Sequence, residues 1–418
     1  MLKRKLFVLL LAVLMLLNVA ACGENGGSES GEPSSSMTES DVPESTDGST
    51  TTTSGTTTTT TASGKETTSR RPNVTTTEKP EPDKPTATTT MSREQYLNQE
   101  KIDIVGSSSD PKGWIYQLGS GGVMVREVTI NSGKGGKAVE IVQMTDLHFN
   151  IINQKDREDT ANYPVIKAIN EFRKHMANGA SRSNAEACLK YGSYFDQMVI
   201  TGDTIDYLTW GAIEMLDEVI WKPYPNALVT LGNHDIVRTW TFKGYVRDTS
   251  TLESRYQILQ DNWKHDIYYT SKVIGNKAMV IQMDNANVVF WDSQIPKLKA
   301  DLEKAKQNGY AVLLFFHIPI STGNSADAKH DALCATDGGF DNLYSTSLNM
   351  YNSATKQVYD IITNNADVIK GIFAGHVHND HYSEVVAKTS DGKDAVIPQY
   401  ILAPAYCDKG HVLKITVK

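Results

Sequence analysis

Polar side chains that can bind metal ions follow directly after five apolar segments of the sequence. In chain order they are Asp146 and His148, Asp203, Asn233, His317, and His376 and His378. Carboxylate, imidazole and amide oxygen groups are ligands for divalent ions such as Zn, Mn and Fe. In an open α/β sheet, chemistry usually takes place on loops at the carboxyl ends of the strands. If the apolar segments are strands of such a sheet, these residues converge on one metal site.

The spacing within two of these stretches favours shared binding. Asp146 alternates with His148, and His376 with His378, and alternate residues of an extended segment point to the same side. Two ions about 3.5–4 Å apart can hold a bridging hydroxide and stabilise the attacking and leaving oxygens of an in-line displacement. Metal binding can lower the pKa of water to about 7, so no strong side-chain base is needed. His234, beside the ligands, is available to assist departure of the leaving group.

Each stretch taken alone is weak evidence. An Asp after a Gly, such as Asp203, is more often a turn or cap residue, and a lone histidine such as His317 is more often a structural polar residue. The five strand ends taken together favour an intact dimetal site. Of the other polar residues, Tyr163 and Arg238 are candidates for substrate contacts, His330 and His381 are pocket-lining or solvated loop residues, and His175, His265 and His411 are expected to be structural.

The elements that would position these residues begin with alternating strands and helices. Four apolar runs predict strands, at 123–130, 139–144, 197–201 and 227–229. Apolar residues at helical spacing predict a helix that is capped by Asp159 or Thr160, and a second helix with Ile213 and Ile220 on its inner face. The β-α-β-α-β order predicts a parallel sheet covered by helices.

The second half of the chain repeats this alternation less regularly. Further strands are predicted at 267–274, 278–283, 288–291, 311–316 and 368–373, and helices at 294–307 and 353–364. Ser293 is a candidate cap for the first of these helices. The closing strands predicted at 383–387, 395–401 and 412–417 suggest a second sheet. The residues alone therefore indicate an α/β fold.

The ordered motifs resemble those of the calcineurin-like metallophosphoesterase superfamily. They are D-x-H, G-D-x-x-D, G-N-H-D, an isolated His after a strand, and G-H-x-H, over about 140–380. The segment 314–320 is most similar to a purple-acid-phosphatase-like branch. The resemblance implies a four-layer α/β/β/α sandwich, in which two mixed sheets are flanked by helices. It also implies two divalent or mixed-valence metal ions, namely Mn, Fe or Zn.

The resemblance also implies a role for each matching residue. One metal would be held by Asp146, His148, Asp203 and His378, and the second by Asp203, Asn233, His317 and His376. His234 would lie beside the substrate, and Asp235 would orient its ring. True purple acid phosphatases carry a metal-binding tyrosine three residues after the bridging Asp, where this chain has Asp206, and they lack the histidine of the first motif. We therefore expect no iron–tyrosinate centre, and we expect Asp206 to organise its loop through hydrogen bonds.

Residues 1–22 have the layout of an export signal. Lys3, Arg4 and Lys5 precede an apolar run that is short for a membrane-spanning helix; an uncleaved anchor helix is the alternative. The sequence Val-Ala-Ala-Cys that ends at Cys22 resembles the lipobox of bacterial lipoproteins, which implies cleavage before Cys22 and lipid on its sulfur. Either interpretation places the rest of the chain outside the cytoplasm, at the extracellular face of the cell membrane.

Composition separates a linker from a folded domain. Residues 23–92 contain no aromatic residue, leucine or isoleucine and are rich in Ser and Thr, which predicts a disordered tether. Residues 93–418 would form the phosphoesterase domain. A formal net charge of −8 argues against a nucleic-acid partner. Cys188, Cys334 and Cys407 imply no disulfide framework, although a Cys334–Cys407 bridge is an open alternative.

We therefore expect an exported, membrane-anchored phosphoesterase that uses two metal ions to hydrolyse small phosphate mono- or diesters. The ligand set does not separate these two substrate classes. The alternative is a surface lipoprotein with the same fold that binds a phosphorylated ligand without turnover. The presence of His234 beside the ligands argues against this alternative, because a binding protein has no need of a proton donor there.

Overall fold

The computed structural model describes residues 102–104, 116–118, 122–174, 179–237, 251–322, 353–378, 380–407 and 409–418. The predicted signal, the predicted linker and Cys22 lie outside these residues, as do most of residues 93–121, and remain predictions. Within the described part of the chain, no helix is long and apolar enough to cross a membrane.

The first sheet contains seven strands in the order β1-β2-β3-β13-β4-β5-β6. Their bounds are Ile102–Ile104 (β1), Tyr116–Leu118 (β2), Met124–Ile130 (β3), Val139–Met144 (β4), Gln197–Thr201 (β5), Leu228–Thr230 (β6) and His411–Val417 (β13). Strands β4, β5 and β6 are parallel, as the alternation of strands and helices predicted. Every residue of β5 and β6 is buried, as expected for a sheet covered on both faces.

The second sheet contains six strands in the order β11-β12-β10-β9-β8-β7. Their bounds are Tyr269–Ile274 (β7), Ala278–Met283 (β8), Ala311–Phe315 (β9), Ile369–Ala374 (β10), His381–Lys388 (β11) and Asp394–Ile401 (β12). Parallel and antiparallel pairs both occur, so the sheet is mixed, as expected.

Two details of the second half differ from the predictions. The predicted strand 288–291 is absent from the structure: Val288 has a φ of 66°, and its amide donates to the carbonyl of Asn285 in a turn. A turn at this point has no extended backbone that could pair with a neighbouring strand. Of the three closing strands, β11 and β12 join the second sheet, whereas β13 lies between β3 and β4 in the first.

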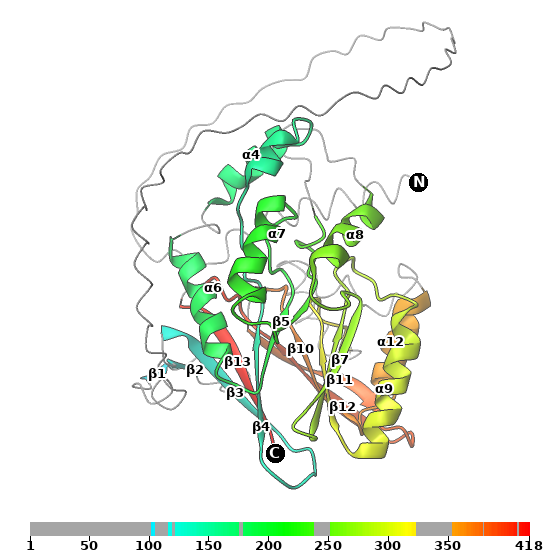
Figure 1. Ribbon diagram of the computed structural model, residues 1–418. Coiled ribbons are helices and arrows are strands. Elements are labelled where there is room, and N and C mark those ends of the chain that lie inside the picture. Colours follow the sequence, from blue (N-terminus) through cyan, green and yellow to red (C-terminus); the bar gives the residue numbers. More distant parts are fainter. Residues whose placement is uncertain are drawn as a thin grey trace, which may run out of the picture. The chain divides into compact units, whose positions relative to one another are not determined.

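Helices cover the outer face of each sheet, which gives the four layers (Figure 1). Helices α6 (Gly179–Gly192), α7 (Trp210–Leu216) and α8 (Leu252–Asn262) share an apolar core with the outer face of the first sheet. Helices α9 (Gln294–Asn308) and α12 (Ser353–Thr363) pack in the same way on the second sheet. Helix α9 begins where predicted, although Ser293 makes no side-chain cap bond. The predicted four-layer α/β/β/α sandwich is confirmed.

Two short helices follow the first ligand motif. Helix α3 (Gln154–Glu158) begins with a capping box in which Asn153 and Asp156 bond each other's backbone amides. Helix α4 (Tyr163–Phe172) is preceded by the N-cap residue Asn162, which makes no side-chain cap bond. The predicted caps Asp159 and Thr160 therefore belong to the turn between the helices. Both helices lie between β4 and β5 in the chain, next to the segments that carry the candidate ligands.

A third apolar core lies between the two sheets. On β4, Ile141 points into this core, whereas Val142 and Met144 point to the helices. Gln143 also points inward, and its amide nitrogen donates to Thr201 of β5 and to the carbonyl of Ala374 at the end of β10, at 3.0 Å each. This amide joins the sheets directly below their carboxyl ends.

Candidate metal centre

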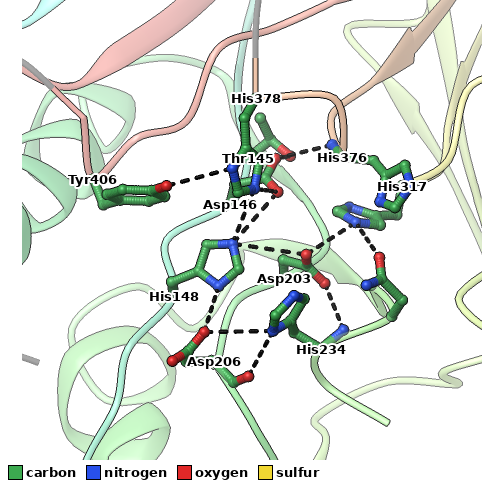
Figure 2. Close-up of polar contacts among 12 residues, drawn as sticks. Thr145, Asp146, His148, Asp203, Asp206, His234, His317, His376, His378 and Tyr406 are labelled. Atoms are coloured by element: carbon green, nitrogen blue, oxygen red, sulfur yellow. Dashed lines mark hydrogen bonds and ion pairs between the residues drawn. The ribbon is translucent and has the colours of Figure 1, made fainter. Parts of the chain in front are cut away.

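The candidate ligands meet where the carboxyl ends of five strands come together (Figure 2). Asp146 and His148 follow β4, Asp203 follows β5, Asn233 follows β6, His317 follows β9, and His376 and His378 follow β10. Backbone bonds join these loops: the Asp146 amide donates to the Gly202 carbonyl at 3.0 Å, and the Gly375 amide to the His317 carbonyl at 2.9 Å. The structure thus brings all the predicted metal ligands together.

The backbone of the ligand loops adopts an unusual conformation. Among the described residues, a positive φ is adopted by seven non-glycine residues, five of which are candidate ligands: Asp146, His148, Asp203, His376 and His378. The left-handed conformation is sterically costly for such residues, and it is found where function requires strain. At these positions it turns side chains from consecutive loops toward a common point (Figure 2).

Two glycines allow the loops to approach each other closely. A Cβ atom on Gly232 would lie 2.2 Å from the Asp203 carboxylate, and one on Gly375 would lie 1.8 Å from the Thr145 hydroxyl. No side chain fits at these distances, so the glycines of the G-N-H-D and G-H-x-H motifs are required by packing as well as by turn geometry.

The first group of candidate ligands comprises Asp146, His148, Asp203 and His378. The Nε2 atoms of His148 and His378 lie 3.3 Å apart, and His378 Nε2 lies 3.1 Å from Asp146 Oδ1. The side chains of His148 and Asp146 are fully buried. Several nitrogen and oxygen donor atoms that converge at such short distances are typical of a metal site.

The second group comprises Asp203, His317 and His376. His317 Nε2 lies 3.2 Å from Asp203 Oδ2 and 3.0 Å from the side-chain oxygen of Asn233. Asp203 Oδ2 also lies 3.7 Å from His148 Nε2, in the first group. Asp203 therefore lies between the groups, where one carboxylate can serve both. The donor set fits two divalent ions, with the ligand division that the resemblance implied.

Comparison with known proteins gives the family. Residues 139–380 match the sequence profile of the calcineurin-like phosphoesterases. The chain belongs to this family. The matched segment begins with β4 and ends two residues after His378, so it includes all the candidate ligands. No curated protein matches the sequence.

Solved structures with a similar fold share little sequence with this phosphoesterase. They include a dimetal phosphatase from Danio rerio (13% identity, 64% of this chain, 88% of that chain, TM-score 0.35). They also include a purple acid phosphatase from yellow lupin, Lupinus luteus (11% identity, 72% of this chain, 48% of that chain, TM-score 0.36). A third is a putative 5′-nucleotidase from Staphylococcus aureus (12% identity, 65% of this chain, 55% of that chain, TM-score 0.30). The chain spans about half the length of the last two.

The proton-donor candidate of the phosphoesterase, His234, differs from the ligands in its surroundings. Its side chain is 14% exposed, whereas those of His148 and His317 are fully buried. Its Nδ1 lies 2.8 Å from the backbone carbonyl of Asp206 and 3.4 Å from the carboxylate of the same residue. This contact leaves Nε2 as the atom available to a substrate.

The expected role of Asp235 is wrong. Its buried carboxylate accepts from the backbone amides of Ile205, at 2.8 Å, and Gly232, at 2.6 Å, and makes no contact with the His234 ring among the described residues. Asp235 therefore joins the loop after β5, which contains Ile205, to the loop after β6, which contains Gly232. The residue that orients His234 is Asp206.

Asp206 stands where purple acid phosphatases carry their metal-binding tyrosine. Its carboxylate contacts His148 Nδ1 at 3.0 Å and the guanidinium of Arg173 at 2.5 and 2.6 Å. It therefore organises its loop through hydrogen bonds, as predicted, although Asp206, His148 and His234 also place donor atoms within 4.8 Å of one another. Tyr207 points away into an apolar cluster with α4, so it does not face the metal groups.

Three residues near the ligands were missed by the sequence analysis. The Thr145 hydroxyl donates to Asp146 Oδ2 at 2.6 Å. The Tyr406 hydroxyl lies 3.4 Å from His378 Nδ1, and its ring packs edge-on against His148. Arg173, described above, is the third. Thr145 directly precedes a ligand, whereas no sequence signal identifies the other two, because their partners are far away in the chain.

The outcome for the other predicted residues depends on whether the structure describes them. His265 accepts from the amide of Val229 at 3.0 Å, and His411 lies 3.6 Å from Asp380, so both are structural, as predicted. Tyr163 begins α4 and His381 begins β11. Arg238, His175, His330 and Cys334 lie outside the described residues. Cys407, next to Tyr406, is disulfide-bonded to a partner outside the described residues, and Cys188 is free and buried.

The carboxylates of the site change the protonation of its histidines. Burial alone would lower the pKa of His148, but hydrogen bonds to Asp146 and Asp206 raise it to about 9. Burial alone would also lower the pKa of His317, but the charge of Asp203 raises it to about 9. Burial and the charge of His317 lower the pKa of His376 to about 3. His148 and His317 are therefore protonated at neutral pH. A metal ion that binds at either imidazole displaces its proton.

Metal binding is therefore expected to release protons at pH 7. His148 and His317, with a pKa of about 9, are mostly protonated at this pH, and only a neutral imidazole can bind a cation. Raising the pH from 7 to 8 should raise the apparent affinity about tenfold for each proton displaced. Calorimetric titration with Zn in buffers of different ionisation enthalpy counts these protons. His148→Gln should release about one fewer proton, and heats that do not depend on the buffer would contradict the prediction.

Proposed function

We propose that this chain is an exported, membrane-tethered phosphoesterase that uses two metal ions to hydrolyse small phosphate mono- or diesters. The position of Asp203 carries the proposal: its carboxylate lies between two groups of buried ligands, 3.2 Å from His317 and 3.7 Å from His148. Two ions in these groups would supply an activated water and stabilise the charge of the phosphoryl oxygens. We expect the ions to be Mn, Fe or Zn, which suit nitrogen and oxygen donors.

The remaining chemistry falls to the residues of the chain. His234 is the partly exposed histidine next to the ligands, and its Nδ1 is held by Asp206. Its Nε2 can donate to a phosphoryl oxygen or to the leaving oxygen in the transition state. The Thr145 hydroxyl donates to Asp146, and the Tyr406 hydroxyl contacts Nδ1 of His378. These contacts fix the orientation of both ligands, so they need not reorganise when the substrate binds.

Hydrolysis of simple aryl esters tests the proposal. The full chain, purified in detergent and loaded with Mn, Zn or Fe, is assayed on p-nitrophenyl phosphate and on bis(p-nitrophenyl) phosphate. Turnover of either ester supports the proposal, and the ratio of the two rates assigns the substrate class. Two bound metals per chain without turnover of any ester would favour the alternative, a lipoprotein that binds a phosphorylated ligand.

The membrane tether rests on the lipobox-like sequence that ends at Cys22. Cys22→Ala removes the sulfur that would carry the lipid. We expect the variant to leave the membrane fraction or to keep its uncleaved signal, and the wild-type chain to carry an added lipid mass on Cys22. An unmodified Cys22 in mature protein would contradict the tether while leaving the enzymatic proposal intact.

A further inference from the structure

Arg173 is a buried arginine that the proposed chemistry leaves without a role. It lies at the carboxyl end of α4 and is 5% exposed. Its Nε donates to Asp206 Oδ2 at 2.6 Å and its Nη2 to Oδ1 at 2.5 Å, so it holds both oxygens of one carboxylate. Such a two-point contact fixes the plane of the carboxylate as well as its charge.

The carboxylate that Arg173 holds contacts the two functional parts of the site. Asp206 Oδ1 lies 3.0 Å from Nδ1 of His148, in the first metal group, and 3.4 Å from Nδ1 of His234, the proton-donor candidate. Figure 2 shows both rings turned toward Asp206 on the side away from the other ligands. A carboxylate on Nδ1 leaves Nε2 to face the metal or the substrate and fixes the orientation of the ring.

Helix α4, which ends next to Arg173, packs against the loop that carries Asp206. Its apolar side chains Val165, Ile166 and Ile169 form a small core with Tyr207, the residue directly after Asp206. This cluster is separate from the three larger cores. The helix is therefore attached to the site by two adjacent residues, Tyr207 through apolar contact and Asp206 through the ion pair.

We propose that Arg173 is a positioning residue that couples the first metal group to the proton donor. By holding the plane of the Asp206 carboxylate, Arg173 keeps the rings of His148 and His234 in their functional orientations. The inference rests on the proposed function for the role of His234, but the link from Arg173 to His148 is independent of turnover. A lysine at this position would supply the charge but not the planar fork.

The test compares Arg173→Lys and Arg173→Met with Lys174→Met, which removes a positive charge from the neighbouring, exposed position just after α4. Affinity for the first metal is measured by Zn titration in a His376→Ala background, which disables the second group. We expect Arg173→Lys to fold as the wild-type chain does and to lose about 10–100-fold in this affinity. Lys174→Met should change nothing.

The second measurement reports on His234. In the chain without the His376→Ala change, Arg173→Lys should slow hydrolysis of phenyl phosphate more than that of p-nitrophenyl phosphate, because the poorer leaving group depends more on a proton donor. Wild-type values in both measurements for Arg173→Lys would overturn the proposal, since charge alone would then suffice. A change in only one measurement would overturn the coupling.

Two further outcomes keep the test decisive. If Arg173→Met fails to fold, because a buried carboxylate is left without its partner, Arg173→Lys alone decides. If the wild-type chain hydrolyses no ester, the proposed function fails, and the metal affinity of the Arg173 variants still tests whether this residue positions His148. Unchanged affinity in that case would overturn the positioning role as well.

Discussion

Replacing Asp203 with asparagine is expected to abolish turnover and to lower the metal content of the protein. The Asp203 carboxylate lies within 3.2 Å of His317 Nε2 and 3.7 Å of His148 Nε2, so both metal groups lose a charged ligand at once. Metal ions supply several kcal/mol of transition-state stabilisation, which corresponds to a loss of about 10³-fold or more in kcat/KM. Steady-state kinetics and elemental analysis measure the two effects.

The side chain of asparagine has nearly the shape of the aspartate that it replaces, so the fold should survive. Asp203 Oδ1 also accepts from the amide of His234 at 2.8 Å, a bond that the amide oxygen of asparagine can keep. Asp292→Asn, the same change at an exposed position, is the matched control and should keep full activity. If Asp203→Asn retained activity within tenfold of wild type, Asp203 would not be the shared ligand.

His234→Ala is expected to separate catalysis from metal binding. The His234 side chain is partly exposed and is held through Nδ1 by Asp206, outside both metal groups that share Asp203. Loss of a proton donor in the transition state costs typically 10²–10⁴-fold in kcat, whereas the metal content should not change. The effect should be larger for phenyl phosphate than for p-nitrophenyl phosphate, because the better leaving group needs less assistance.

The neighbouring residue provides the contrast. Asn233 lies 3.0 Å from His317 Nε2 through its side-chain oxygen, so Asn233→Ala should weaken binding of the second metal. Titration of each variant with Zn, together with rates at saturating metal, distinguishes the two effects. Equal loss of metal in both variants would show that the division between Asn233 as ligand and His234 as donor is wrong.

The sequence by itself determined the frame of the site. Apolar runs that end in a polar residue, such as 197–201 before Asp203, predict both the strand and the position of its carboxyl end, because the hydrophobic pattern is local. The strands β4, β5, β6, β9 and β10 were predicted for this reason. Since carboxyl ends of neighbouring parallel strands share an edge, the pattern gathers the ligands after β4, β5 and β6 at one edge and those after β9 and β10 at another. The packing of the two sheets brings these edges together.

Only the tertiary structure decided which residues support the ligands. Arg173 is separated from Asp206 by 33 residues, and Tyr406 from His378 by 28, so no local pattern links them. The resemblance implied that Asp235 orients the His234 ring, yet the turn directs its carboxylate to the amides of Ile205 and Gly232. Side-chain direction in a turn follows the backbone dihedrals rather than sequence distance.

The placement of β13 also depends on contacts between segments that are distant in the chain. Its alternating apolar residues predicted a strand, which we expected in the second sheet. The structure inserts it between β3 and β4, where Leu413, Ile415 and Val417 complete the core between the sheets. A strand pattern records which residues are buried, whereas the choice of neighbour depends on contacts distant in the chain. Local hydrophobicity therefore determined the strands and ligands, and long-range packing determined their partners.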